Sequence, residues 1–450
     1  MDALDLSYRL AVSLAGAAAR ACARGLPENW RLRLEAQAPD LPAGRWIWLH
    51  AVSVGELLLA DGLVERLLQA GHRIHVTTGT LAGLDLLERR RSDWDGGSGQ
   101  LSGGAFPLDD PAGLESFLVH PPGAFIALET ELWPGLLLAL EERGIPRLVV
   151  NGRLTEKSLE RGGAWLRRAA SRLSLVAARD DTSVEAFRRL GASEVALGGN
   201  LKADLPPPRP LHPGWVALRV AWADAPVLVV GNSVEGEEER LLEVWTVARA
   251  SFPDLRLILA PRQPRRFEAV ASLFTNRGLA FRRASSSWPD EGTWKALDVL
   301  LLDTLGELPA AYAEGTVALV AGGWTATGGH NPLEPVRAGL PTLIGPGFSN
   351  FEDLVAPLVA AERVEVVDLS GLEASLLATL AQAPRRSETS LPLPDSLAGA
   401  LDRTWALVAP QLPLVRQEAV QVFERPAMGP GGMHRKEGPA GRCGGIVQGP

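Results

Sequence analysis

Residues 45–78, "RWIWLHAVSVGELLLADGLVERLLQAGHRIHVTT", hold two short apolar runs on either side of a longer segment. The runs at 45–51 and 73–78 are rich in aromatic and β-branched residues, which is typical of buried strands. Between them, in 55–72, apolar residues recur at helical spacing. A strand, a helix and a strand in this order predict parallel strands in a sheet covered by helices.

The same alternation continues along the rest of the chain. Helices are expected at 235–250 and 264–278 in the second half. Further strands are expected at 124–130, 146–152, 173–180, 225–233, 255–262, 296–303, 316–323 and 340–346. The sequence therefore predicts an α/β protein with two Rossmann-like, parallel-sheet domains that face a cleft, with ligands beyond the carboxyl ends of the strands.

The composition excludes several classes of protein. The 450 residues are 46% apolar, enough for two domains, and the net charge is −8. No dense stripe of Lys and Arg accompanies a nucleic-acid-binding motif, so nucleic acid is not an expected partner. The only cysteines, Cys22 and Cys443, exclude a disulfide framework and fit a reducing cytoplasmic compartment. Histidines are scattered without metal-ligand spacing, so no metal is expected.

The two ends of the chain and its proline-rich middle suggest the domain boundaries. Five prolines in 205–214 predict a stiff linker between a domain at 27–204 and a domain at 215–410. The Gly- and Pro-rich segment 411–450 is expected to be a disordered tail. No apolar run is long enough to span a bilayer. Residues 1–26 could form a cationic helix on a membrane surface, or an ordinary packing helix.

The segment "GGHNPLEP" (328–335) comes between an apolar run and an expected helix. Asn331 suits a helix N-cap, Pro332 the first helical position, and Glu334 the return partner of a capping box. Two glycines before such a helix let backbone N–H groups approach an anion. The segment predicts a site for a nucleotide mono- or diphosphate, with a plain capped turn as the alternative.

The loops of the first half carry acids and a lysine. Glu56 follows the strand at 45–51 at a helix start, where the dipole helps to keep a carboxylate ionised by about 0.3–1 kcal/mol. It could point into the cleft as a base, or only complement the dipole. Glu129 and Glu131 end another strand, and at most one of them is expected to enter the cleft easily. Lys202 could counter a negative charge or be a solvated lysine.

In the second half, Arg262 follows a strand end, where a guanidinium could bind phosphate or carboxylate. The segment around Gly306 and Glu307 precedes a helix and could bind a ribose or a base edge. Either segment could be an ordinary turn.

Taken together, these segments resemble the 3-deoxy-D-manno-octulosonic acid (Kdo) transferases of lipopolysaccharide and lipid A biosynthesis. The matching motifs are "HAVSVGE", "ETELWP", "NGRLTEKS", "GNLKAD", "GNSVEGEEE", "APRQPRRF", "DTLGEL" and "GGHNPLEP", between residues 50 and 335. The resemblance implies a two-domain GT-B glycosyltransferase that uses CMP-Kdo as donor and needs no metal cofactor. It also implies a lipid A precursor as acceptor, at the cytoplasmic face of the inner membrane.

By this resemblance the first domain binds the acceptor and Glu56 is the general base. Glu129 and Lys202 would assist the transition state. The residues that would hold the CMP moiety are Pro261, Arg262, Leu305, Gly306, Glu307, Asn331, Pro332, Leu333 and Glu334. The basic stretch 153–172 and the N-terminal helix could contact anionic lipid headgroups, although a solvated helix face explains the stretch as well.

Two departures from the family pattern put donor affinity or specificity in doubt. Val234 stands where the family commonly has a histidine, and Gln263 begins "QPRR" where the family commonly has His-Pro-Glu-Arg. The alternatives are another GT-B sugar-nucleotide enzyme, such as a UDP-sugar transferase or epimerase, and a catalytically silent lipid-binding scaffold.

Overall fold

The computed structural model describes residues 3–96, 99–161, 163–205, 212, 214–223, 225–288, 291–325, 327–383, 393–394 and 397–414. The chain divides into a unit Met1–Pro413 and a unit Leu414–Pro450. All helices and strands below belong to the first unit. Most of the predicted linker and nearly all of the predicted tail lie outside the described residues.

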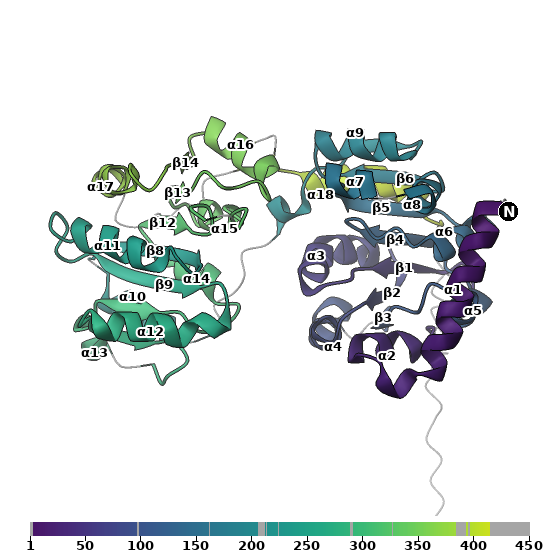
Figure 1. Cartoon of the computed structure of the whole chain (residues 1–450), viewed down its shortest axis with the longest axis horizontal. Helices are drawn as coiled ribbons and strands as arrows, with labels where there is room; N and C mark the ends of the chain where they lie inside the picture. The colour runs from purple at the N-terminus through teal and green to yellow at the C-terminus, as the bar shows by residue number, and fades with distance from the viewer. Residues whose placement is uncertain are drawn as a thin grey trace, which may run out of the picture. The chain divides into compact units, whose positions relative to one another are not determined.

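The first sheet has seven parallel strands in the order β3-β2-β1-β4-β5-β6-β7 (Figure 1). The strands are β1 (Trp46–His50), β2 (Arg73–Thr78), β3 (Leu101–Ala105), β4 (Ala124–Leu128), β5 (Arg147–Gly152), β6 (Leu175–Ala178) and β7 (Val195–Leu197). Its helices are α3 (Val54–Gln69), α4 (Leu81–Asp95), α5 (Pro111–Val119), α6 (Pro134–Glu141), α7 (Glu156–Arg161), α8 (Gly163–Ala170) and α9 (Asp181–Leu190).

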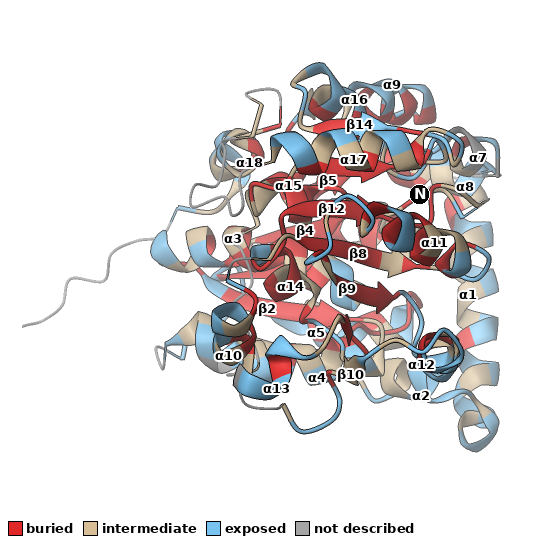
Figure 2. Ribbon diagram, turned by 90° about the vertical axis from the view of Figure 1, so that its left-hand side faces the viewer, coloured by how far each residue is buried: buried red, intermediate tan, exposed pale blue. Residues whose placement is uncertain are grey.

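Alternate residues of β1 supply the two faces of this sheet. Trp46 and Trp48 pack with α5, α6, α8 and α9, whereas Ile47 and Leu49 pack with α3 and α4. A strand buried on both faces needs apolar residues at nearly every position, which explains the continuous run of β1. The neighbouring strands β4 and β5 are coloured as buried in Figure 2.

The second sheet repeats this plan in the order β10-β11-β9-β8-β12-β13-β14. Its strands are β8 (Val227–Ser233), β9 (Arg256–Pro261), β10 (Phe281–Arg283), β11 (Val299–Leu301), β12 (Val317–Val320), β13 (Thr342–Ile344) and β14 (Val364–Val366). Helices α11 (Glu238–Ala248), α12 (Phe267–Asn276) and α17 (Leu372–Gln382) share one core, and α10 (Gly214–Ala221), α13 (Glu291–Lys295) and α14 (Leu308–Ala313) share another. Short helices α15 (Leu333–Arg337) and α16 (Glu352–Ala360) join a third core.

Two terminal segments also pack on the first sheet. Helix α1 (Ala3–Ala21) contacts α5, α6 and α8, and α2 (Glu28–Leu34) follows it. Helix α18 (Ala400–Val408) buries Ala400 and Val408 in the core of α3. The sequence placed residues 215–410 with the second sheet. The structure differs here because the apolar face of α18 completes the first core.

The order of strands reverses at one point in each sheet, between β1 and β4 and between β8 and β12. Loops at such a switch point diverge and leave room for a ligand. The pairing of β5 with β6 shifts register at left-handed Asn151, and the pairing of β8 with β9 does so at left-handed Asn232. The residues predicted to be functional follow β1, β4 and β7 in the first sheet and β9, β11 and β12 in the second.

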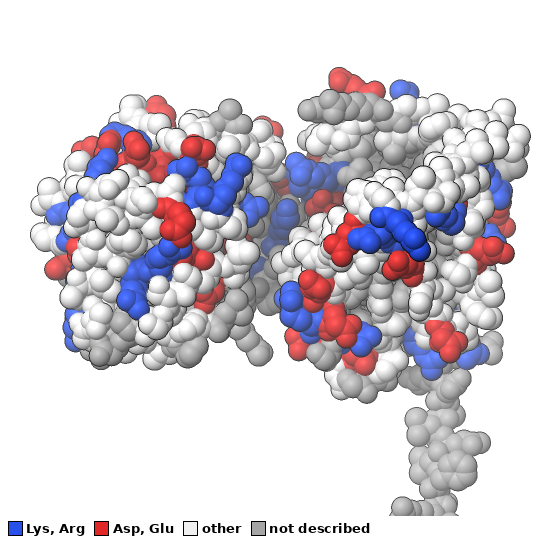
Figure 3. All heavy atoms as spheres, turned by 60° about the horizontal axis from the view of Figure 1, so that its bottom comes forward, with Lys and Arg blue, Asp and Glu red and all other residues white. Residues whose placement is uncertain are grey.

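Acidic and basic side chains lie next to one another over the surface in Figure 3. Many form ion pairs, such as Arg256 with Asp298 and Arg266 with Glu238. Within the described residues, no helix is both long and apolar enough to cross a membrane.

Candidate functional site

Glu56 lies in the first turn of α3, directly after β1. Ser53 is the N-cap, and its hydroxyl accepts a hydrogen bond from the Glu56 backbone N–H. The Glu56 carboxylate turns back over the helix start, where one oxygen accepts from Val52 N–H at 2.7 Å and the other from the Ser53 hydroxyl at 3.2 Å. Glu56 therefore does cap the start of α3, as one of the two interpretations of the sequence expected. A carboxylate has about four lone-pair positions, so these two bonds leave lone pairs that can accept a hydrogen bond from the hydroxyl group of a ligand.

The pKa of Glu56 is raised to about 7, mainly by burial and then by the charges of Glu131 and Glu129. The sequence predicted that the helix dipole would keep this carboxylate ionised. The desolvation penalty is the larger effect, because burial disfavours the charged form. Glu56 therefore exchanges its proton near neutral pH, as a general base requires.

Glu129 and Glu131 both lie near Glu56, and the prediction that at most one of them enters the site is wrong. Residues i and i+2 of an extended chain point to the same face, so extended geometry does not separate these two acids. Glu129 in addition has a left-handed φ of +56°. A non-glycine residue in the left-handed region carries strain, and such strain is concentrated at functional sites. Trp133 then ends the loop before Pro134 begins α6.

Aromatic rings form one wall beside these acids. The His50 ring stacks on Phe106 with centroids 3.8 Å apart, and Phe106 contacts Trp133 at 5.1 Å. His50 Nδ1 lies 3.1 Å from the Thr77 carbonyl oxygen, and its Nε2 lies 3.9 Å from the Glu131 carboxylate. Burial lowers the pKa of His50 to about 3, so its ring is neutral.

Lys202 lies in a short 3-10 helix, Leu201–Asp204, whose first N–H donates to the Asn151 side chain at 2.9 Å. This bond joins the lysine segment to the end of β5 beside the switch point. Burial lowers the pKa of the Lys202 ammonium, and nearby Glu129 partly restores it. The structure thus brings together Glu56, Glu129 and Lys202, the three residues predicted to be catalytic.

In the second sheet, Arg262 follows β9 and lies near His330 and Glu334. Burial and the Arg262 charge lower the pKa of His330 to about 4, and the same charge opposes the rise that burial causes in the pKa of Glu334. Pro261 is the last residue of β9. These contacts join the "PR" and "NPLE" segments that the sequence predicted to share a ligand.

The start of α15 differs slightly from the prediction. The helix begins at Leu333 rather than Pro332, and the Asn331 side chain accepts from Leu333 N–H at 3.1 Å, as a capping side chain does. The expected return hydrogen bond of Glu334 is not among the hydrogen bonds of the described residues. Gly328 and Gly329 have φ of 80° and 76°, and a Cβ on Gly328 would meet Asn350. Backbone geometry and close packing therefore already require glycine there.

The turn before α14 holds the remaining predicted ligands of the nucleotide. Leu305 is 72% exposed, and Gly306 is left-handed with φ of 84°. Glu307 is buried; one carboxylate oxygen accepts from Thr304, and the other is a buried atom without a hydrogen-bond partner among the described residues. An unpaired buried oxygen of this kind suits a hydroxyl donor.

Sequence reasoning did not find the role of Glu237. Its buried carboxylate accepts from the N–H groups of Gly322 at 2.6 Å and Trp324 at 2.9 Å, and so fixes the loop after β12. The run of acidic residues in "VEGEEE" (234–239) is the sequence feature that could have indicated this role. Val234, one of the two departures from the family motifs, begins the turn that precedes α11. At the other departure, Gln263, the side-chain oxygen accepts a hydrogen bond from Arg265.

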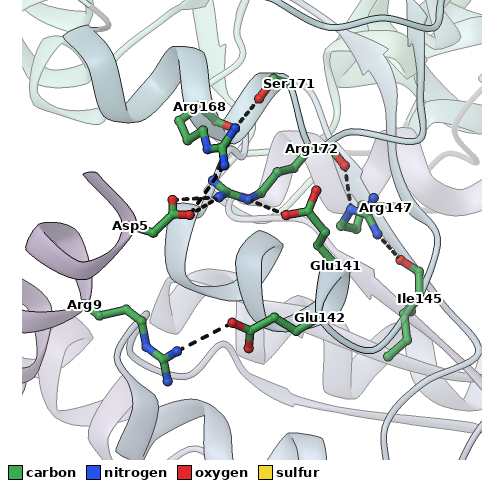
Figure 4. A network of polar contacts seen from close by, with 9 residues as sticks. All are labelled: Asp5, Arg9, Glu141, Glu142, Ile145, Arg147, Arg168, Ser171 and Arg172. Carbon is green, nitrogen blue, oxygen red and sulfur yellow. Dashed lines mark hydrogen bonds and ion pairs between the residues drawn. The ribbon is translucent and has the colours of Figure 1, made fainter. Parts of the chain in front are cut away.

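Helix α1 is fixed to the first sheet by buried polar contacts (Figure 4). Arg172 is 3% exposed and donates to both oxygens of Asp5 at 2.6 and 2.7 Å, and to Glu141 at 2.9 Å. The Tyr8 hydroxyl donates to buried Asp109 at 2.7 Å. Arg172, the last residue of the basic stretch 153–172, is bound by Asp5 and Glu141 and so is neither on a solvated face nor available to lipid headgroups.

Two parallel seven-stranded sheets covered by helices are the architecture of the GT-B glycosyltransferases. In agreement, UDP-GlcNAc 2-epimerase from Methanocaldococcus jannaschii has a similar fold, with a TM-score of 0.51 at 12% identity over 79% of this chain and 97% of that one. Residues 28–205 match the family model described as 3-deoxy-D-manno-octulosonic-acid transferase (kdotransferase). The chain belongs to the Kdo transferases and is a glycosyltransferase.

Two relatives establish the family. The 3-deoxy-D-manno-octulosonic acid transferase of Bordetella pertussis is 36% identical over 342 residues, which is 73% of this chain and 77% of the relative. The protein of the same name from Haemophilus influenzae is 34% identical over 333 residues, 72% of this chain and 76% of the relative.

Proposed function

We propose that the protein transfers Kdo from CMP-Kdo to a lipid A precursor, with inversion at the anomeric carbon and without a metal ion. The observation that carries the proposal is the site at the first switch point. There Glu56, with a pKa of about 7, lies near Glu129 and Glu131 in a half-buried loop cluster that Lys202 adjoins. A base of this pKa and a cation are what such a transfer needs.

In the proposed reaction, Glu56 accepts the proton of an acceptor hydroxyl as its oxygen bonds to the anomeric carbon of Kdo. The bond from that carbon to the phosphate oxygen of CMP breaks on the opposite face, and CMP leaves with the electron pair. Lys202 counters the charge on the leaving phosphate, and Glu129 holds the lysine. A lysine and an arginine supply the positive charge that a metal ion provides in other nucleotide-sugar enzymes.

The nucleotide would bind at the second switch point. Arg262 would bind the phosphate, and Pro261 would line the same pocket. Leu305, Gly306 and Glu307 would contact the ribose and base. The turn formed by Asn331, Pro332, Leu333 and Glu334 would complete the pocket.

The test is product formation by the purified protein from CMP-Kdo and a tetraacyl lipid A precursor, in buffer with EDTA. We expect CMP release that requires acceptor, and a lipid product whose mass has increased by whole Kdo residues. Product that forms only with added divalent cation would contradict metal independence. Calorimetric titration that showed preference for UDP over CMP would contradict the donor assignment.

We also propose that α1 holds the enzyme on the cytoplasmic face of the inner membrane. Leu6, Leu10 and Leu14 recur every four residues and are 58%, 62% and 64% exposed, so they form one apolar stripe. The opposite face, with Asp5 and Gly16 buried, packs on the protein. An apolar stripe on a surface helix is typical of interfacial binding.

Serine at all three leucines should reduce co-sedimentation with vesicles that contain anionic phospholipid. The matched control is serine at Val216 and Val220 of α10, which are 67% and 51% exposed. Equal binding by both variants would contradict a role for the leucine stripe.

A further inference from the structure

Arg33, at the end of α2, reaches from outside the first sheet into the candidate site. Its Nε and Nη2 donate to the Pro107 carbonyl oxygen at 3.3 and 3.0 Å. That carbonyl lies in the loop after β3, whereas Arg33 precedes every strand in the chain. One side chain therefore joins the N-terminal segment to a loop at the carboxyl end of the sheet.

The guanidinium of Arg33 also covers the aromatic wall. Its central carbon lies 4.4 Å from the Trp133 ring centroid and 5.4 Å from that of Phe106. Phe106 in turn stacks on His50, directly after which the chain turns toward Glu56. A planar guanidinium that lies over two rings and donates hydrogen bonds to a carbonyl fixes the positions of the rings, which a flexible ammonium does not.

The charges of the site give Arg33 a second role. Glu56, Glu129 and Glu131 repel one another, as the effect of the two others on the Glu56 pKa shows. Lys202 interacts with Glu129, and Arg33 interacts with Glu131. Lys202 therefore offsets the charge of Glu129, and Arg33 offsets the charges of Asp109 and Glu131.

We propose that Arg33 is a positioning residue of the transferase reaction: it holds the Phe106–Trp133 wall in place beside Glu56, and its charge acts on Glu131. The proposal rests on the proposed function of Glu56 as the base. Under this proposal α2 contributes a residue to the active site, whereas α1 attaches the enzyme to the membrane.

The experiment compares Arg33→Ala, Arg33→Lys and the control Arg31→Ala, a change to an exposed arginine of the same helix. Misplacement of a reacting group can cost about 10- to 100-fold in rate, so we expect a kcat loss of that size in Arg33→Ala. KM for CMP-Kdo should stay within about twofold, since the proposed donor site is on the second sheet. Added guanidinium ion should restore part of kcat in Arg33→Ala, and Arg33→Lys should remain impaired.

A loss of kcat equal to that of Arg31→Ala would overturn the proposal, and so would full activity of Arg33→Lys. A loss without guanidinium rescue would also overturn it, because general destabilisation explains that result. If the wild-type protein made no product, the proposed function would fail instead. In that case the inference would be tested by the melting temperatures of Arg33→Met, Glu131→Gln and the double variant. Non-additive shifts of the melting temperature would support it, and additive shifts would contradict it.

Discussion

The pH dependence of transfer tests the role of Glu56 most directly. With a pKa of about 7, this carboxyl group is ionised in about a tenth of the molecules at pH 6 and about nine tenths at pH 8. Only the ionised form accepts a proton. The value of kcat/KM should therefore rise about tenfold from pH 6 to pH 8 and level off above that range.

Two substitutions separate Glu56 from other groups that titrate. Glu56→Gln should lower kcat by about 10²- to 10⁴-fold and remove the rise. Glu131→Gln removes a charge that raises the Glu56 pKa, so the rise should move to lower pH. The control is Glu65→Gln, the same change at an exposed position of α3, which should leave the profile unchanged.

Initial rates of CMP release at saturating donor, measured in buffers of constant ionic strength, provide the profile. A flat profile between pH 6 and pH 8 would refute the assignment of Glu56 as a base with a raised pKa. A profile of Glu131→Gln that coincides with the wild type would refute the electrostatic coupling of the two acids.

Three further predictions concern other parts of the molecule. Lys202→Met should lower kcat by about 10²- to 10³-fold in single-turnover assays, because a cation near the leaving phosphate is lost; retained activity would argue against that role. Arg262→Ala should weaken CMP binding about 10- to 100-fold by calorimetry, and unchanged affinity would place the phosphate elsewhere. Asp5→Ala should lower the free energy of unfolding by about 3 kcal/mol in urea titrations, since it leaves one side of buried Arg172 unpaired; a change below about 1 kcal/mol would show that Glu141 is a sufficient partner.

The strands that the sequence predicted are the inner strands of both sheets. Their runs are apolar at nearly every position, as burial on both faces requires. The strands it did not predict are β3, β7, β10 and β14, which are the four edges. An edge strand has less to bury, and "LSGGA" of β3 or "VEV" of β14 lacks the apolar run that identifies a central strand.

The motifs predicted which loops carry charged residues, but not how those residues lie. Nothing in the local sequence indicated the positive φ of Glu129. The expectation that only one of Glu129 and Glu131 enters the site was wrong because residues i and i+2 of an extended chain share a face. The pKa of Glu56 depends on burial by residues far along the chain. Arg33 had no local signal, because its partners Pro107 and Trp133 come from loops that only the folded sheet brings near α2.

The left-handed backbone of Glu129 has a consequence for protein engineering. Holding an L-residue in that conformation costs about 1–2 kcal/mol, which glycine would not pay. A search guided by thermal robustness alone would therefore favour Glu129→Gly and would discard the acid that interacts with Lys202. On the proposed role of Glu129 in the transition state, selection for stability and selection for turnover act in opposite directions at this position.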